Sequence, residues 1–150
     1  MSNKWIALLL LATLLACGVG SCLNDNEPAY MKNIYVAKEG YDGISAYFIL
    51  ADGNGASTTA DGIVKMTIRD SDSNRRLYEN EWNVTKSDFQ KVTLGLGSFQ
   101  HEDIICNIGR IPYSDMNNVP DDEYARGDVR ISFTTLNGTV FSGEETVYFN

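Results

Sequence analysis

The chain has 150 residues, of which 20 are acidic, 12 are basic and one is a histidine, and its net charge is −8 at neutral pH. This length corresponds to one domain of ordinary size, and the acidic balance argues against binding to the phosphate backbone of nucleic acids. The single imidazole, His101, excludes metal sites that need two histidines. The 43% hydrophobic and 21% charged content is typical of a folded globular protein.

The first element in chain order is a targeting segment. Lys4 precedes an apolar run from Trp5 to Ala16 that is broken only by one threonine, and this arrangement is that of a signal peptide. At about 1.5 Å per residue the run is too short for the roughly 30 Å hydrocarbon core of a bilayer, so a permanent membrane-spanning helix is not expected. Residues 1–21 are therefore predicted to be an export signal.

This segment ends in small residues followed by a cysteine. The tetrapeptide Val-Gly-Ser-Cys at residues 19–22 resembles the lipobox of prokaryotic lipoproteins, in which an aliphatic and two small residues precede the lipidated cysteine. The resemblance implies that Cys22 carries lipid and that the protein is exported and anchored to the outer face of a prokaryotic membrane. A rival motif ends at Cys17 but has a bulky leucine at its second position. The alternative is a plain secretory signal that is cut near Ala16 or Ser21 and leaves Cys22 unmodified.

Residues 22–31 are predicted to form a lipidated tether. The part from Leu23 to Ala29 is polar, contains a proline and measures roughly 25 Å when fully extended, so the folded domain is expected close to the membrane. That domain is assigned to residues 32–150. With Cys17 removed and Cys22 lipidated, Cys106 has no partner for a disulfide.

From Lys32 onward the apolar residues recur with a period of two, which predicts an all-β domain. Residues 64–69 and 129–134 alternate without a fault and are expected to be strands with one face in water. Asn137-Gly138 then predicts a tight hairpin that returns through residues 139–141. Further strands are expected at residues 33–38, 44–51, 76–84, 90–96, 103–111 and 145–149, the last joined to 139–141 through a bulge at Ser142-Gly143.

Seven to eight strands separated by turn residues in about 120 residues predict a single antiparallel sandwich of two sheets. By architecture this sandwich resembles immunoglobulin and fibronectin type III domains, although it lacks the Cys, Trp and Cys core of antibody domains. Residues 111–122 are the expected irregular excursion, with one helical turn. Such a fold does not by itself give a function.

The best candidate for a metal site is an acidic turn between two predicted strands. Four oxygen-bearing residues stand at positions 1, 3, 5 and 12 of an EF-hand calcium loop: Asp70, Asp72, Asn74 and Glu81. Three features oppose Ca²⁺ binding: Arg75 replaces the glycine of the sharp turn, Arg75 and Arg76 place two positive charges beside the proposed ion, and the flanking segments are expected to be strands rather than helices. The alternative is a polar hairpin whose side chains bond to the local backbone.

Other polar and reactive side chains have weaker signals. The Asp-Gly-Asn-Gly segment at residues 52–55 is either a ligand loop at a strand end or a flexible turn. His101 lies beside two carboxylates, Glu102 and Asp103, but no nucleophile motif accompanies them, so His101 is expected in a surface loop. Cys106 alternates with apolar neighbours and is expected in the core. Trp82 is also expected in the core, although exposed aromatic rings would suit sugar binding.

These features predict a non-enzymatic, lipid-anchored protein of the cell envelope that acts as an interaction or structural accessory module, with an envelope protein as its partner. The alternative is a module that binds an extracellular ligand, a glycan by preference, with help from Ca²⁺. A third hypothesis is a hydrolase, which needs two carboxylates within roughly 10 Å of one another in a cleft. No catalytic residue, no other cofactor and no nucleic-acid partner are predicted.

Overall fold

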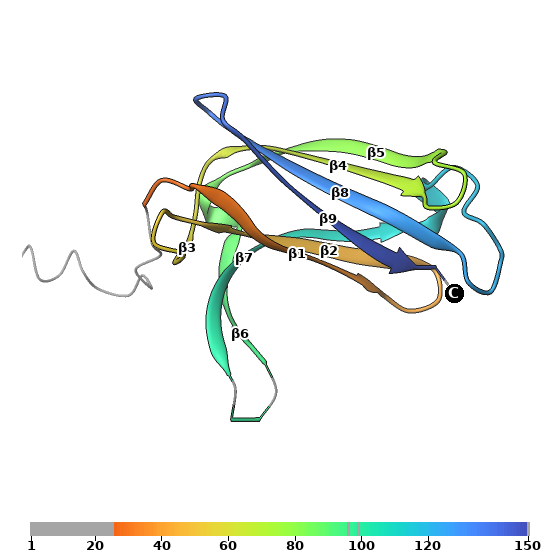
Figure 1. Ribbon diagram of the computed structural model, residues 1–150, viewed down its shortest axis with the longest axis horizontal. Coiled ribbons are helices and arrows are strands. Elements are labelled where there is room, and N and C mark those ends of the chain that lie inside the picture. Colours follow the sequence, from red (N-terminus) through yellow and green to blue (C-terminus); the bar gives the residue numbers. More distant parts are fainter. Residues whose placement is uncertain (1–25, 96, 99, 150) are drawn as a thin grey trace, which may run out of the picture.

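The computed structural model describes residues 26–95, 97–98 and 100–149, and strands dominate this part of the chain (Figure 1). The predicted signal segment and Cys22 lie outside the described residues. The described part contains two 3₁₀ turns, η1 (Lys86–Asp88) and η2 (Tyr113–Asp115). It forms nine strands: β1 (Tyr30–Lys38), β2 (Gly43–Ala51), β3 (Ser57–Thr58), β4 (Gly62–Asp70), β5 (Arg76–Val84), β6 (Phe89–Leu94), β7 (His101–Pro112), β8 (Arg126–Thr135) and β9 (Val140–Tyr148).

The strands form two antiparallel sheets that pack face to face. One sheet has the order β1-β2-β7-β6, with the short β3 paired to β2, and the other has the order β5-β4-β8-β9. Figure 1 shows the two sheets as the layers of a sandwich. The predicted all-β architecture with two antiparallel sheets is confirmed, and the described part has nine strands where seven to eight were expected.

Two strands differ from the prediction. The two-residue β3 was not expected, because only its pairing with the end of β2 makes it a strand. The C-terminal strand runs without a register shift from Val140 to Tyr148, so the bulge expected at Ser142-Gly143 is absent. The hairpin at Asn137-Gly138 is confirmed: the backbone N–H of Thr135 donates to the carbonyl of Thr139, and Gly138 has a φ of 88°.

The core lies between the two sheets and follows from the period of two. Val64, Met66 and Ile68 on β4 are fully buried, whereas the residues between them face water or are partly exposed. Phe48 of the opposite sheet packs against Phe133 with ring centroids 5.7 Å apart. Each fully buried side chain of this size contributes about 1.5–3 kcal/mol to stability. Alternation on both inner faces therefore accounts for the sandwich.

Glycines lie where the pairing of β4 and β8 ends. A Cβ atom at Gly62 would lie 2.3 Å from the carbonyl oxygen of Thr134, and one at Gly127 would lie 2.4 Å from the ring of Phe149. Such distances are far below van der Waals contact, so a side chain at either position would displace the backbone or the core. These two glycines are needed for close packing rather than for an unusual backbone conformation.

The N-terminal segment is bonded to the sandwich before β1 begins. The side-chain amide of Asn26 donates to Oδ2 of Asp52 at 2.8 Å, and the hydroxyl of Thr58 donates to the carbonyl oxygen of Asn26. The backbone N–H of Ala29 then donates to the carbonyl of Ala51 at 2.7 Å. The described part of the predicted tether, from Asn26 onward, is thus bonded to the sandwich.

The long strand β7 divides its pairing between two neighbours. Its first half, up to Cys106, pairs with β6, and its second half, from Cys106 to Pro112, pairs with β2. Because the first half has left β2, β6 and the start of β7 project from the body as an arm (Figure 1). We call residues 89–106 the arm.

Candidate functional site

Loops gather at the two ends of the elongated sandwich (Figure 1). The tether end holds the start of β1, the segment 52–61 around β3, and the β8–β9 turn at residues 136–139. The opposite end, here the distal end, holds the β1–β2 turn, the β4–β5 turn, the loop that follows η2 and the end of β9.

The four residues of the predicted calcium loop do not meet. Asp70, Asp72 and Asn74 lie in or beside the β4–β5 turn, but Glu81 stands on β5 opposite Lys65. Lys65 is five residues before Asp70 on β4, which corresponds to about 16 Å along a strand. Calcium ligands lie only about 2.3–2.6 Å from the ion, so one ion cannot reach all four. The strand register thus corrects the proposed ligand set, because the EF-hand spacing requires a loop that curls around the ion.

The turn residues bond to one another and to their surroundings instead. The Ser73 hydroxyl donates to Asp70 at 2.5 Å and the backbone N–H of Asp72 donates at 3.0 Å, and both bonds lower the pKa of the Asp70 carboxyl. Asp72 forms an ion pair with Arg126 at 3.2 Å. In the described ranges, no three His, Cys, Asp or Glu side chains lie close enough together to hold a metal ion. The geometry is that of the polar hairpin alternative.

The glycine-rich loop at residues 52–55 is organised around a buried carboxylate. Asp52 is 3% exposed, and its Oδ1 accepts the backbone N–H groups of Asn54 at 2.9 Å and Ala56 at 3.1 Å. Its Oδ2 accepts the side chain of Asn26. The loop therefore joins the N-terminal segment to the sandwich, and its aspartate is occupied by structural hydrogen bonds.

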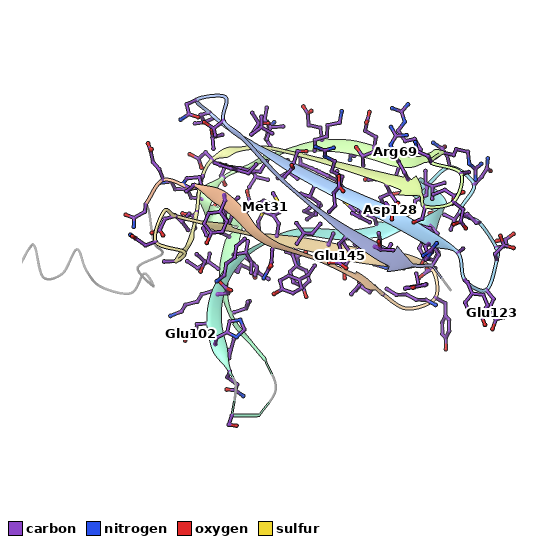
Figure 2. All side chains as sticks on the ribbon, viewed as in Figure 1. Met31, Arg69, Glu102, Glu123, Asp128 and Glu145 are labelled. Atoms are coloured by element: carbon purple, nitrogen blue, oxygen red, sulfur yellow. The ribbon has the colours of Figure 1, made fainter. Side chains whose placement is uncertain are left out.

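His101, Glu102 and Asp103 lie on the arm, and Asp103 is the buried one of the three. His101 is the first residue of β7 rather than a loop residue, and Asp103 is buried with 3% of its surface exposed. Oδ2 of Asp103 lies 3.3 Å from Nζ of Lys32 and 3.9 Å from Nε2 of His101, whereas Oδ1 has no hydrogen-bond partner in the described structure. Glu102 points to the solvent side of the arm (Figure 2).

Sequence reasoning missed this buried ion pair. Lys32 is the extra residue at a register shift of β1, between Met31 and Asn33, and such bulges redirect side chains. Lys32 and Asp103 are 71 residues apart, so no local pattern relates them.

The outer face of the β5-β4-β8-β9 sheet is a polar hollow of about 750 Å³. Arg69 and Asp128 lie on this face (Figure 2). Its charges are largely paired: Lys65 lies 3.3 Å from Glu79, and Arg130 lies 3.6 Å from Glu144. The hydrogen bond from Lys65 lowers the pKa of Glu79, whereas a general acid needs a raised pKa.

Two tyrosines that face each other across β1 and β2 form a stacked pair. Tyr35 and Tyr47 are stacked on each other, with centroids 5.1 Å apart and an interplanar angle of 26°, so each ring covers a face of the other. Trp82 is partly buried and packs against the core, in agreement with its predicted place. No aromatic side chain is among the residues that line the polar hollow.

Exposed large hydrophobic side chains divide between the two ends. Ile63, Leu136 and Val140 lie towards the tether end, on the outer face of the sheet or in the β8–β9 turn. Tyr41 and Tyr124 are 95% and 75% exposed at the distal end. Tyr30, at the start of β1, is 44% exposed at the tether end. The exposed aliphatic side chains of the described domain therefore lie at the tether end, whereas exposed tyrosines occur at both ends.

Among residues 26–95, 97–98 and 100–149, no helix is long and apolar enough to cross a membrane. No family model and no curated protein matches the chain. The chain is similar in structure to AT1g01470 from Arabidopsis thaliana, known from its solution structure, with a TM-score of 0.46 and 11% sequence identity over 88% of this chain and 87% of that one.

Proposed function

We propose that this protein is a lipid-anchored, non-enzymatic accessory module of a prokaryotic cell envelope, exported by its signal segment and held to the membrane through Cys22. The observation that carries the proposal is the bonding of the N-terminal segment to the tether end. Asn26 is fixed by the buried side chains of Asp52 and Thr58. Only three residues lie between Cys22 and Asn26, so the two are at most about 14 Å apart along the chain.

The module is an immunoglobulin-like sandwich. With β3 set aside, the order β1-β2-β7-β6 corresponds to strands A-B-E-D of immunoglobulin domains, and β5-β4-β8-β9 corresponds to C′-C-F-G. This correspondence follows the chain order from A to G and supports the assignment. The arm, which extends the D–E hairpin, is the chief departure from the pattern.

The distal end is the part of the module available to an envelope protein. An anchor at Cys22 places the tether end next to the membrane and the distal end farthest from it. Tyr41 and Tyr124 are highly exposed at the distal end, and Tyr148 is 55% exposed. Tyrosine is enriched at protein interfaces because its ring is apolar and rigid while its hydroxyl forms hydrogen bonds.

The experiment that tests the anchor compares two serine variants of the full chain in a prokaryotic host. We expect mass spectrometry of the mature protein to find a diacylated or triacylated Cys22 at the N-terminus. Cys22→Ser should move the protein from the membrane fraction to the soluble exported fraction, because the site of lipidation is lost. Cys17→Ser is the matched control, and it should leave the protein in the membrane fraction.

Two outcomes contradict the proposal. An unmodified mature N-terminus at Gly18 would mean that an ordinary secretory signal is cut after Cys17. Retention of Cys22→Ser in the membrane fraction together with loss of Cys17→Ser would assign the lipid to the rival motif.

A further inference from the structure

We infer that the aliphatic patch at the tether end, formed by Ile63, Leu136 and Val140, lies against the lipid surface to which Cys22 is anchored. The inference rests on the proposed function, since it takes the anchor as given. It goes further by assigning a second contact with the membrane and a fixed orientation of the sandwich.

The three side chains lie close together at the tether end, with Thr134 between Ile63 and Val140. Ile63 on β4 is paired in register with Thr134 on β8, and Thr134 is paired with Val140 on β9. Neighbouring strands are about 4.8 Å apart, so Ile63 and Val140 are separated by roughly 10 Å on the same face. Leu136 stands just beyond this row, in the hairpin turn.

The patch is exposed although its side chains are aliphatic. Ile63 is 38% exposed, Val140 60% and Leu136 82%. At the distal end the exposed large hydrophobic side chains of the described chain are tyrosines, which tolerate water through their hydroxyl groups. Aliphatic side chains lack such a group, and transfer of their surface from water to lipid is favourable.

The length of the chain before Asn26 brings the patch within reach of the membrane. Asn26 is bonded to Thr58, and Ile63 follows Thr58 by five residues, or at most about 18 Å. Figure 1 shows the start of β1 and the β8–β9 turn at the same end of the sandwich. With only three residues between Cys22 and Asn26, a lipid on Cys22 draws this end onto the bilayer.

The test uses a polarity-sensitive fluorophore on an introduced cysteine in the full mature lipoprotein. Leu136→Cys carries the label at the patch, and Tyr124→Cys is the control at the distal end. Cys106 is 1% exposed, so it does not compete for the label. Zwitterionic phosphatidylcholine vesicles are used because the acidic protein is repelled by anionic lipid.

On reconstitution we expect a blue shift at Leu136→Cys and strong quenching by lipids brominated on their acyl chains, with neither change at Tyr124→Cys. A label on Val140→Cys should be quenched as well, and this quenching should be lost when Leu136→Asp is added, because a charge resists entry into lipid. Equal, weak quenching at Leu136→Cys and Tyr124→Cys would overturn the inference. So would a blue shift that depends on protein concentration without vesicles, since a second copy would then cover the patch.

Mass spectrometry of the same samples separates the two proposals. Lipid on Cys22 without quenching at the patch contradicts only the membrane contact. Absence of lipid on Cys22 contradicts the proposed function itself.

Discussion

Cys106 lies between the two sheets, where β7 passes from β6 to β2. It is 1% exposed and packs in the hydrophobic core, as its alternation with apolar neighbours predicted. Burial, together with a smaller effect of the negative charge of Asp88, raises the pKa of the Cys106 thiol to about 12. Because the thiolate is the reactive form, this cysteine behaves as a small apolar residue.

Cys106 should make stability depend on alkaline pH. The unfolded thiol ionises near pH 8.5, whereas the folded thiol stays protonated up to about pH 12. Above pH 8.5 the unfolded state therefore loses its proton first and is favoured. We expect urea unfolding to show that the stability difference between wild type and Cys106→Ala shrinks from pH 7 to about pH 10. A difference that stays constant or grows would contradict the raised pKa.

At the scale of elements, the arm is held to the body by polar contacts. The ion pair between Lys32 of β1 and Asp103 of β7 is one of them, and the hydrogen bond from the backbone N–H of Ile104 to the Ser57 hydroxyl is another. The side chain of Asp103 is 2% exposed. Water therefore contributes little to stabilising its carboxylate, and the ion pair with Lys32 contributes more. Both contacts join the start of β7 to other strands of the same sheet.

Lys32→Met should destabilise the protein by roughly 2 kcal/mol. Removal of one partner from a fully buried ion pair costs about 3–5 kcal/mol, and the partial exposure of Lys32 lowers that cost. Lys91→Met is the matched control, because Lys91 pairs with Glu102 at 2.5 Å on the exposed side of the arm and should cost less than about 1 kcal/mol. Urea unfolding measures both changes. Equal losses of stability in Lys32→Met and Lys91→Met would contradict a buried ion pair between Lys32 and Asp103. So would no recovery of stability when Asp103→Asn is added to Lys32→Met.

At the scale of the whole molecule, the register of β4 and β5 separates the predicted calcium ligands. Glu81 is held opposite Lys65, far from the turn that carries Asp70 and Asp72. The two strands are hydrogen-bonded from the turn to beyond Glu81, so a small motion of the turn does not bring Glu81 to it. At the turn, the Ser73 hydroxyl donates a hydrogen bond to Asp70 and Arg126 forms an ion pair with Asp72 instead.

We therefore expect the same thermal midpoint, within about 1 °C, for the full chain in millimolar Ca²⁺ and in EDTA. A ligand at 100 times its dissociation constant stabilises a protein by about 2.7 kcal/mol, which would raise the midpoint of this domain by several degrees. A calcium-dependent increase that disappears in both Asp70→Ala and Glu81→Ala would contradict the separation of these residues. Differential scanning calorimetry provides the measurement.

The sequence by itself determined the features that depend on neighbours in the chain. The period of two gave the buried faces of β4 and β8, because successive side chains in a strand point to opposite sides. Asn137-Gly138 gave the hairpin, because glycine adopts the positive φ that the turn requires. The lipobox resemblance is equally local, and it concerns residues outside the described part of the chain.

Only the tertiary structure decided which distant residues meet. It placed Asn26 on Asp52 and Thr58, and it paired Lys32 with Asp103. It also separated Glu81 from Asp70 although the spacing along the chain suggested one loop. The physical reason is that strand register and sheet order are set by the packing of both sheets together, and a contact between residues dozens of positions apart leaves no periodic trace in the sequence.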